Sequence, residues 1–229
     1  FIFLAQKAYV KKMTEVGLQN VFWLPLACDP DIHGKVEQEK KWDVGFVGTI
    51  PEVQNRRKTL LERIGSRFNL SCERKFMNEM AEHYSASKIV YNNAINNDLN
   101  MRVFEALCSG SLLLTDSASG SGLEEMFENR KHLIIYEDEN IENLIAHYLE
   151  NDMDRELIAE QGRYEVLKNH TYEHRAEDLI NVLNCKIREQ SKESRDMEKP
   201  ENYYKNIRHD LISLVPEDAN CILEVGCAE

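Results

Sequence analysis

A run of five residues, SLLLT at 111–115, most constrains how this chain can fold. It is almost continuously apolar, and it follows a short helix-like segment that stops at Gly110, a usual place for glycine after a helix. A strand that is apolar on both faces belongs to a parallel sheet covered by helices on both sides. The run therefore predicts a buried strand of an α/β fold.

Strand-like and helix-like segments alternate on both sides of this run. Strands are expected at 42–50, 69–74, 88–94, 111–115 and 132–136, and helices at 53–68, 78–86, 101–108, 122–128 and 141–150. The alternation predicts a doubly wound parallel sheet of Rossmann-like type, followed by a helical C-terminal segment over 153–190. Because ligands of such sheets bind at the carboxyl ends of the strands, the candidate site lies in the loops after Val47, Tyr91 and Leu114.

Charge and composition exclude several classes of protein. The 229 residues carry 28 basic and 40 acidic side chains, a net charge of −12, which argues against a general nucleic-acid binder. No run approaches the roughly 20 apolar residues of a membrane span. The six cysteines form no C-x-x-C pair and no cluster with zinc spacing, so we expect no metal site and a reducing, cytoplasmic location.

The most informative segment is NDLNMRVFEALCSG at 97–110, because it places a helix N-terminus after a strand. A phosphate can be bound there by free backbone N–H groups, those of Asn100, Met101 and Arg102. The Arg102 guanidinium can also donate two hydrogen bonds to phosphate oxygens. One turn later, the Glu105 carboxylate can accept hydrogen bonds from a ribose diol. Spacing alone leaves a second interpretation open, in which Arg102 and Glu105 form a surface ion pair.

NMRVFEALCSGSLLLTD at 100–116 is similar to the donor-binding region of GT-B glycosyltransferases, within the group that has a CgeB-like C-terminal domain (glycosyl transferases group 1). DVGFVGT at 43–49, SASKIVYNN at 85–93 and HTYEHRAEDLINVL at 170–183 extend the resemblance over about 21–183. The resemblance implies the Rossmann-like half of a GT-B fold. It also implies transfer of a sugar from a nucleotide-diphosphate sugar to an unknown acceptor, which is a glycan, a protein or a small molecule.

The same resemblance implies roles for several residues. Many retaining enzymes of this type carry two glutamates separated by seven residues, and Glu105 matches the second, which holds the ribose. Asn97 stands at the first position, where it can hydrogen-bond a sugar hydroxyl, and this departure leaves the stereochemical outcome open. Asn92 and Asn93 are candidate contacts for the base, with plain turn asparagines as the equal alternative.

The turn after the first strand is expected to face the diphosphate. Gly48 allows close approach of the backbone, and Thr49 can donate to a phosphate oxygen, although an ordinary tight turn has the same pattern. Of the three basic residues that open the next helix, we choose Arg57 over Arg56 and Lys58 as the diphosphate ligand.

Four parts are expected along the chain: the tail of an N-terminal acceptor domain with the interdomain linker (1–34), the nucleotide-sugar-binding domain (35–190), a linker (191–200), and the truncated start of a second domain (201–229). CILEVGCAE at 221–229 resembles the first motif of class I S-adenosylmethionine methyltransferases, with Glu224 and Gly226 at its first two signature positions. The chain begins at Phe1 and ends inside this motif, so we expect a fragment of a longer protein.

Three functions follow as hypotheses. The first is a glycosyltransferase whose donor-binding half is inactive by itself; the second is a non-catalytic nucleotide-binding or scaffold module of a glycosyltransferase–methyltransferase fusion. The third, methyltransfer, concerns only the parent chain, which would bind S-adenosylmethionine. No metal or cofactor is expected here, since no Asp-x-Asp motif occupies a suitable loop. We nominate no catalytic base, and we interpret His33, near the expected interdomain hinge, as structural.

Overall fold

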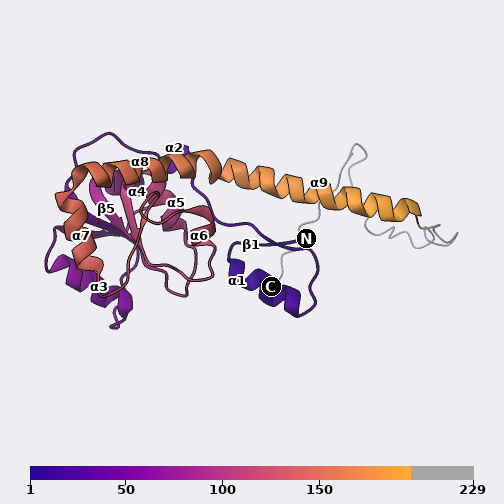
Figure 1. Ribbon diagram of the computed structural model, residues 1–229, viewed down its shortest axis with the longest axis horizontal. Coiled ribbons are helices and arrows are strands. Elements are labelled where there is room, and N and C mark those ends of the chain that lie inside the picture. The colour runs from indigo at the N-terminus through magenta and orange to yellow at the C-terminus, as the bar shows by residue number, and fades with distance from the viewer. Residues whose placement is uncertain (197–229) are drawn as a thin grey trace. The chain divides into compact units, whose positions relative to one another are not determined.

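The computed structural model describes residues 1–196. The chain divides into two compact units, Phe1–Leu183 and Asn184–Glu229. The first unit, in which helices surround the strands (Figure 1), contains a parallel sheet. Its strand order, β4-β3-β5-β6-β7, confirms the expected doubly wound architecture. Its strands are β3 (Trp42–Val47), β4 (Leu70–Glu73), β5 (Ser87–Tyr91), β6 (Leu112–Thr115) and β7 (Ile134–Ile135).

Seven helices accompany this sheet in the described residues: α3 (Arg56–Gly65), α4 (Met77–Ser85), α5 (Met101–Cys108), α6 (Leu123–Met126), α7 (Ile141–Glu150), α8 (Asp152–Asn169) and α9 (Tyr172–Asp196). The β6 strand, which the sequence singles out, is buried along its whole length. Because successive side chains of a strand point to opposite faces, Leu113 joins one core cluster while Leu112 and Leu114 join another.

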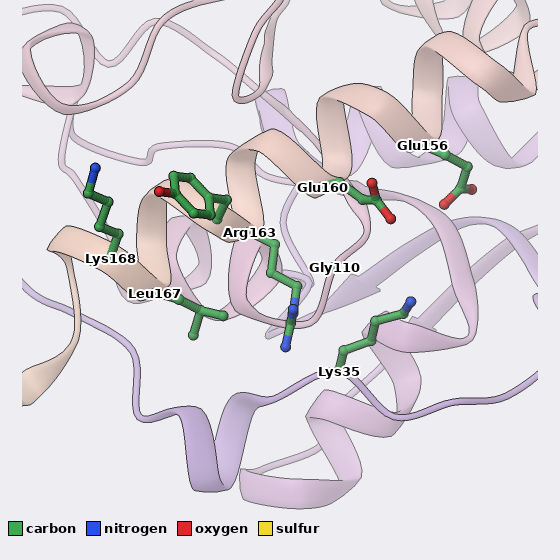
Figure 2. A pocket seen from close by; sticks show the side chains of 8 residues that line it. Lys35, Gly110, Glu156, Glu160, Arg163, Leu167 and Lys168 are labelled. Carbon is green, nitrogen blue, oxygen red and sulfur yellow. The ribbon is translucent and has the colours of Figure 1, made fainter.

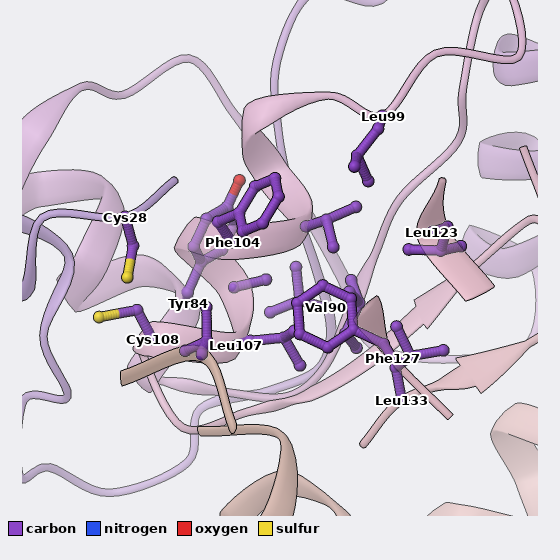
Figure 3. Packing of buried hydrophobic residues seen from close by; sticks show 14 of the residues in the cluster. Cys28, Tyr84, Val90, Leu99, Phe104, Leu107, Cys108, Leu123, Phe127 and Leu133 are labelled. Atoms are coloured by element: carbon purple, nitrogen blue, oxygen red, sulfur yellow. The ribbon is translucent and has the colours of Figure 1, made fainter. Parts of the chain in front are cut away.

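Different helices cover the two faces of the sheet. Tyr84 of α4 and Phe104 of α5 pack with Leu113 in the first cluster, where the Cys28 and Cys108 side chains point toward one another (Figure 3). The second cluster is formed with apolar side chains of α3 and α7. Helix α8 contributes to both clusters. Burial of both faces explains why β6 has no polar alternation.

Capping residues set the ends of the two helices nearest the candidate site. Helix α3 begins at Arg56, later than the expected 53, because the Asn55 side-chain oxygen accepts a 2.9 Å hydrogen bond from the Lys58 N–H. Helix α5 has the expected bounds. Gly110 follows it with a φ of +72°, the left-handed conformation that glycine adopts without strain.

The N-terminal segment is a small βαβ unit followed by a turn of helix. It consists of β1 (Ile2–Leu4), α1 (Lys7–Glu15), β2 (Val21–Trp23) and α2 (Pro30–His33), and β1 pairs in parallel with β2. Lys7 contacts the Glu125 carboxylate of α6 and also lies over the Trp23 ring. That this segment is the tail of an acceptor domain stays a prediction.

The helical C-terminal segment is present, with a break between α8 and α9 at His170 and Thr171. Helix α9 continues to Asp196, so the first six residues of the expected linker are helical. The reason is that Lys, Glu and Arg are good helix formers and that no proline occurs between Tyr172 and Pro200. Residues 197–200 and the expected methyltransferase start, 201–229, lie outside the described residues. Within 1–196, no helix is long and apolar enough to cross a membrane.

Candidate functional site

The order of the strands opens a crevice between β3 and β5. The chain goes from β3 to β4 on one side and then to β5 on the other, so the loops after β3 and β5 diverge at the carboxyl edge of the sheet. Gly48 and Thr49 follow β3, and Asn92 and Asn93 follow β5. The fold therefore brings these four predicted residues to one switch point.

Arg57 reaches this switch point from the first turn of α3. Its side chain is buried and donates to the Asn93 side-chain oxygen (3.0 Å), the Asn93 carbonyl (3.1 Å) and the Thr49 carbonyl (3.2 Å). Burial, and secondly the charge of Arg102, lower its pKa from the ordinary value. Arg57 thus joins the loop after β3 to the loop after β5. This position agrees with its predicted role as the diphosphate ligand, which requires a cation at the switch point.

Arg102 reaches the same point from α5. It donates to the Val47 carbonyl (3.0 Å) and to the Asn92 side-chain oxygen (2.7 Å). The two guanidinium carbons lie over the Phe46 ring, at 4.7 Å for Arg102 and 5.5 Å for Arg57. Two cations therefore lie against one aromatic ring at the carboxyl edge, and they create a local positive field in an acidic protein.

Gly48 is required by this packing. Its φ is +155°, and a Cβ placed on it would lie 2.6 Å from Arg102 Nη2 and 3.0 Å from the Phe46 ring. The turn after β3 therefore approaches the guanidinium more closely than any other residue would permit. The sequence predicted a glycine here so that the backbone could closely approach a diphosphate. In this structure the group that lies closest to Gly48 is the Arg102 guanidinium.

A cavity of about 330 Å³ opens beside these groups. Its lining consists of Asn55, Arg56, Arg57, Asn93, Ala94, Ile95 and Asn97. Asn97 has a positive φ of 52°, a conformation that asparagine tolerates better than most residues. The cavity thus collects three predicted site residues: Arg57 from α3, and Asn93 and Asn97 from the loop after β5.

The N-terminus of α5 is left without a side-chain cap. Asn100 occupies the capping position but makes no capping hydrogen bond, and its Oδ1 is buried without a partner. Met101 remains exposed at 38%. First-turn amides that no side chain satisfies, next to Arg102, form an environment that favours an anion.

Glu105 is buried within α5, where burial raises its pKa to about 7 and Arg102 acts against that rise. Its Oε1 lies 3.8 Å from His33 Nε2. The alternative of an Arg102–Glu105 surface pair is wrong for this structure, because Glu105 is buried and Arg102 donates its hydrogen bonds to Val47 and Asn92 instead.

Sequence reasoning missed an acidic cluster at the rim. Arg56 forms ion pairs with Asp116 (2.6 Å) and Asp138 (2.7 Å), and Asp116 also accepts from the Ala94 N–H (2.9 Å). Lys58 donates to a backbone carbonyl at Glu52. Hence Arg57, of the three basic residues, lies deepest in the crevice. The sequence feature that could have indicated Asp116 as a site residue is its position directly after the buried SLLLT strand.

A second cavity, of about 480 Å³, lies away from these residues (Figure 2). It is lined by residues of α8, with Lys35 and with Gly110, which precedes β6 and so marks the amino edge of the sheet. None of the predicted site residues lines it. In residues 1–196 there is no group of three His, Cys, Asp or Glu side chains that could hold a metal ion.

Residues 54–181 match the model of the Glycosyl transferase-like family (Glyco_trans_1_2). The chain belongs to this family. The match covers more than half of the chain and includes Arg57, Asn93 and Arg102 of the crevice, while Phe46, Gly48 and Thr49 lie just before it. No curated protein sequence shows a significant match to the chain.

Solved structures agree on the fold. HepE from Anabaena, in a complex with UDP, has a TM-score of 0.64 at 11% identity over 81% of this chain and 64% of HepE. S. aureus TarM, in a complex that contains UDP, has a TM-score of 0.58 at 14% identity over 80% of this chain and 43% of TarM.

The C-terminal domain of LpcC, a group 1 glycosyl transferase from Francisella tularensis, has a TM-score of 0.51 at 14% identity, over 63% of this chain and 99% of that domain. The five-stranded sheet of unit Phe1–Leu183, with its helices, therefore has the fold of a GT-B C-terminal domain. The chain spans less than two thirds of the length of HepE and TarM.

Proposed function

We propose that this chain is the donor-binding half of a GT-B glycosyltransferase and that it binds a UDP-sugar. One observation carries the proposal: Arg57 and Arg102 hold their guanidinium groups over Phe46 at the switch point, beside the uncapped N-terminus of α5. Relatives of the same fold support the choice of nucleotide, since HepE was solved with UDP-glucose. Sugar transfer by the parent enzyme, to a glycan, protein or small-molecule acceptor, belongs to the same proposal.

In this proposal the diphosphate lies between the two arginines and the amides of Asn100, Met101 and Arg102. Charge that develops on the departing diphosphate would be stabilised by groups already in place, which is how electrostatic preorganisation lowers a barrier. Thr49 is retained as a phosphate donor through its hydroxyl, since only its carbonyl is used by Arg57.

The nucleoside and sugar are assigned to the neighbouring residues. Glu105 orients the ribose, and Asn97 contacts the sugar from the cavity wall. The side-chain oxygens of Asn92 and Asn93 are used by the two arginines, so the base is expected to contact the other polar groups of this loop.

Calorimetric titration with UDP and GDP tests the proposal. We expect UDP to bind, and we expect Arg102→Gln and Glu105→Ala to weaken binding by roughly tenfold or more, because each removes a charged hydrogen-bonding partner. Lys58→Ala is the matched control, one residue from Arg57 but bonded to the Glu52 carbonyl. Absence of binding by either nucleotide, or equal binding by all variants, contradicts the proposal.

The alternative, a non-catalytic scaffold module, is favoured by one observation: Asn97 stands where many retaining enzymes have a glutamate. It predicts that neither nucleotide binds, so the same titration separates the two functions. We further propose that residues 201–229 begin a methyltransferase domain in the parent protein, supported by the CILEVGCAE resemblance. Translation of the gene past Glu229 would show whether the next glycine of that motif follows.

A further inference from the structure

His33 and Glu105 form a buried pair, of which the proposed function uses only Glu105. His33 lies at the end of α2, in the segment that joins β2 to β3, and Glu105 lies in the middle of α5. Both side chains are at least nine-tenths buried, at 7% and 10% exposure, and His33 Nε2 lies 3.8 Å from Glu105 Oε1. His33, in the segment between β2 and β3, thus faces the Glu105 carboxylate, which is proposed to bind the ribose.

The local structure of α2 fixes the state of the histidine ring. The Asp29 N–H donates to His33 Nδ1 at 3.0 Å, so Nδ1 is the acceptor of the ring. In a neutral imidazole the proton then sits on Nε2, the atom that faces Glu105. Asp29 also caps α2 by accepting from the Asp31 N–H at 3.0 Å, which holds the turn and the ring in place.

Glu105 lacks the partners that a buried carboxylate normally has. Within the described residues its carboxylate accepts no hydrogen bond, and burial raises its pKa to about 7. An ionised carboxylate accepts hydrogen bonds at both oxygens, whereas a protonated carboxyl group turns one oxygen into an O–H donor and is the poorer acceptor for a ribose diol. An N–H donor that holds one oxygen would favour the ionised form and leave the second oxygen for the ribose.

We infer that His33 is a positioning residue for the donor ribose: its Nε2–H holds Oε1 of Glu105 and directs the carboxylate toward the ribose hydroxyls. The inference rests on the proposed role of Glu105. A movement of about 1 Å brings the pair from 3.8 Å to hydrogen-bonding distance. Nucleotide binding is then linked to the segment between β2 and β3, because that segment carries His33, the hydrogen-bond donor to Glu105.

The charged and titratable groups around the pair come from four elements. They are Arg102 of α5, Tyr84 of α4, Tyr172 of α9, and Asp29 beside His33. Binding of UDP is expected to strengthen as pH rises from 6 to 8, by up to roughly tenfold, as Glu105 loses its proton. Removal of the His33 donor should move the midpoint of this dependence to higher pH.

The test uses the 229-residue chain and three variants. His33→Phe removes the hydrogen-bond donor, and His33→Gln restores an N–H at a similar reach. His83→Phe is the control, because His83 is an equally buried histidine whose ring lies against Tyr84. Carbon-13 NMR titration of the Glu105 carboxyl group, and UDP and 2′-deoxy-UDP titrations at several pH values, are the readouts. Circular dichroism confirms that each variant is folded.

In His33→Phe we expect a higher Glu105 pKa and roughly tenfold weaker UDP binding. We expect a much smaller change with 2′-deoxy-UDP, and near-wild-type values for His33→Gln and His83→Phe. An unchanged Glu105 pKa in His33→Phe, or equal loss with both nucleotides, overturns the inference while leaving the proposed function intact. If the wild-type chain binds no nucleotide, the proposed function fails and the ribose-positioning role fails with it.

Discussion

Arg102 donates a 2.7 Å hydrogen bond to the side-chain oxygen of Asn92, and this bond joins α5 to the loop after β5. The same guanidinium donates to the Val47 carbonyl at the end of β3. One side chain therefore holds both strand ends of the switch point, and it stabilises the fold as well as the candidate site.

Arg102→Ala should destabilise the empty domain. The change leaves the Asn92 side-chain oxygen and the Val47 carbonyl without a donor, at about 1–3 kcal/mol for each buried acceptor. Urea unfolding should therefore show a free energy lower by at least about 2 kcal/mol, with a change under about 0.5 kcal/mol for Lys58→Ala. Equal stabilities for Arg102→Ala and wild type would show that water replaces the guanidinium at no cost.

Gly122→Ala should weaken the contact between the loop after β6 and the N-terminal segment. Gly122 has a φ of +95°, and a Cβ there would lie 2.4 Å from the Trp23 ring. Gly120, with a φ of +76° and open space around it, is the matched control for backbone strain alone. We expect roughly 1 kcal/mol of destabilisation for Gly120→Ala and about 2–4 kcal/mol for Gly122→Ala. Trp23 fluorescence should change only in the latter.

Gly162→Ala should be among the more damaging single changes in α8. A Cβ at this position would lie 2.1 Å from the His132 carbonyl oxygen and 2.7 Å from a Leu107 methyl carbon, and the backbone atom cannot yield easily. We expect a loss of roughly 3 kcal/mol in urea unfolding. In Gly65→Ala the nearest atom is a flexible Leu70 methyl at 3.3 Å, so that variant should be neutral or slightly stabilised by helix propensity.

The stability of the domain should fall in acid because of His170. Burial, and secondly the charge of Arg175, lower the pKa of His170 to about 4, so its contribution is present above pH 6.5 and is lost as pH falls toward 4. The maximum loss is roughly 3 kcal/mol. His170→Asn keeps an acceptor for the 2.9 Å contact with Arg175 but does not titrate. Denaturant midpoints of the two proteins should diverge below pH 6.5 and run parallel above it.

Glu105 should have the opposite dependence on pH. Its folded pKa of about 7 lies above the ordinary 4.5, so the folded state loses stability as pH rises from 4.5 through 7. Glu105→Gln removes this loss, and the variant should gain up to roughly 3 kcal/mol over wild type at pH 8 but little at pH 4.5. Identical pH profiles for the two proteins would show that the carboxylate is better solvated than its burial implies.

The sequence by itself determined the α/β architecture and the bounds of α5. These features depend on local information: apolar periodicity, a glycine after a helix, and a strand that is apolar on both faces. The family was also evident from sequence, because short motifs in the right order over 21–183 carry the resemblance. Boundaries were less accurate where a cap decided them, as at Asn55.

Only the tertiary structure decided which polar residues meet. Arg57 and Arg102 are 45 positions apart in the sequence, yet both lie over Phe46 because β3 and β5 are neighbours in the sheet. Likewise, no local pattern places His33 beside Glu105 or Arg56 between Asp116 and Asp138. Such pairs depend on the order of strands and the packing of helices across the sheet, and these are set by burial of the whole core rather than by any one segment.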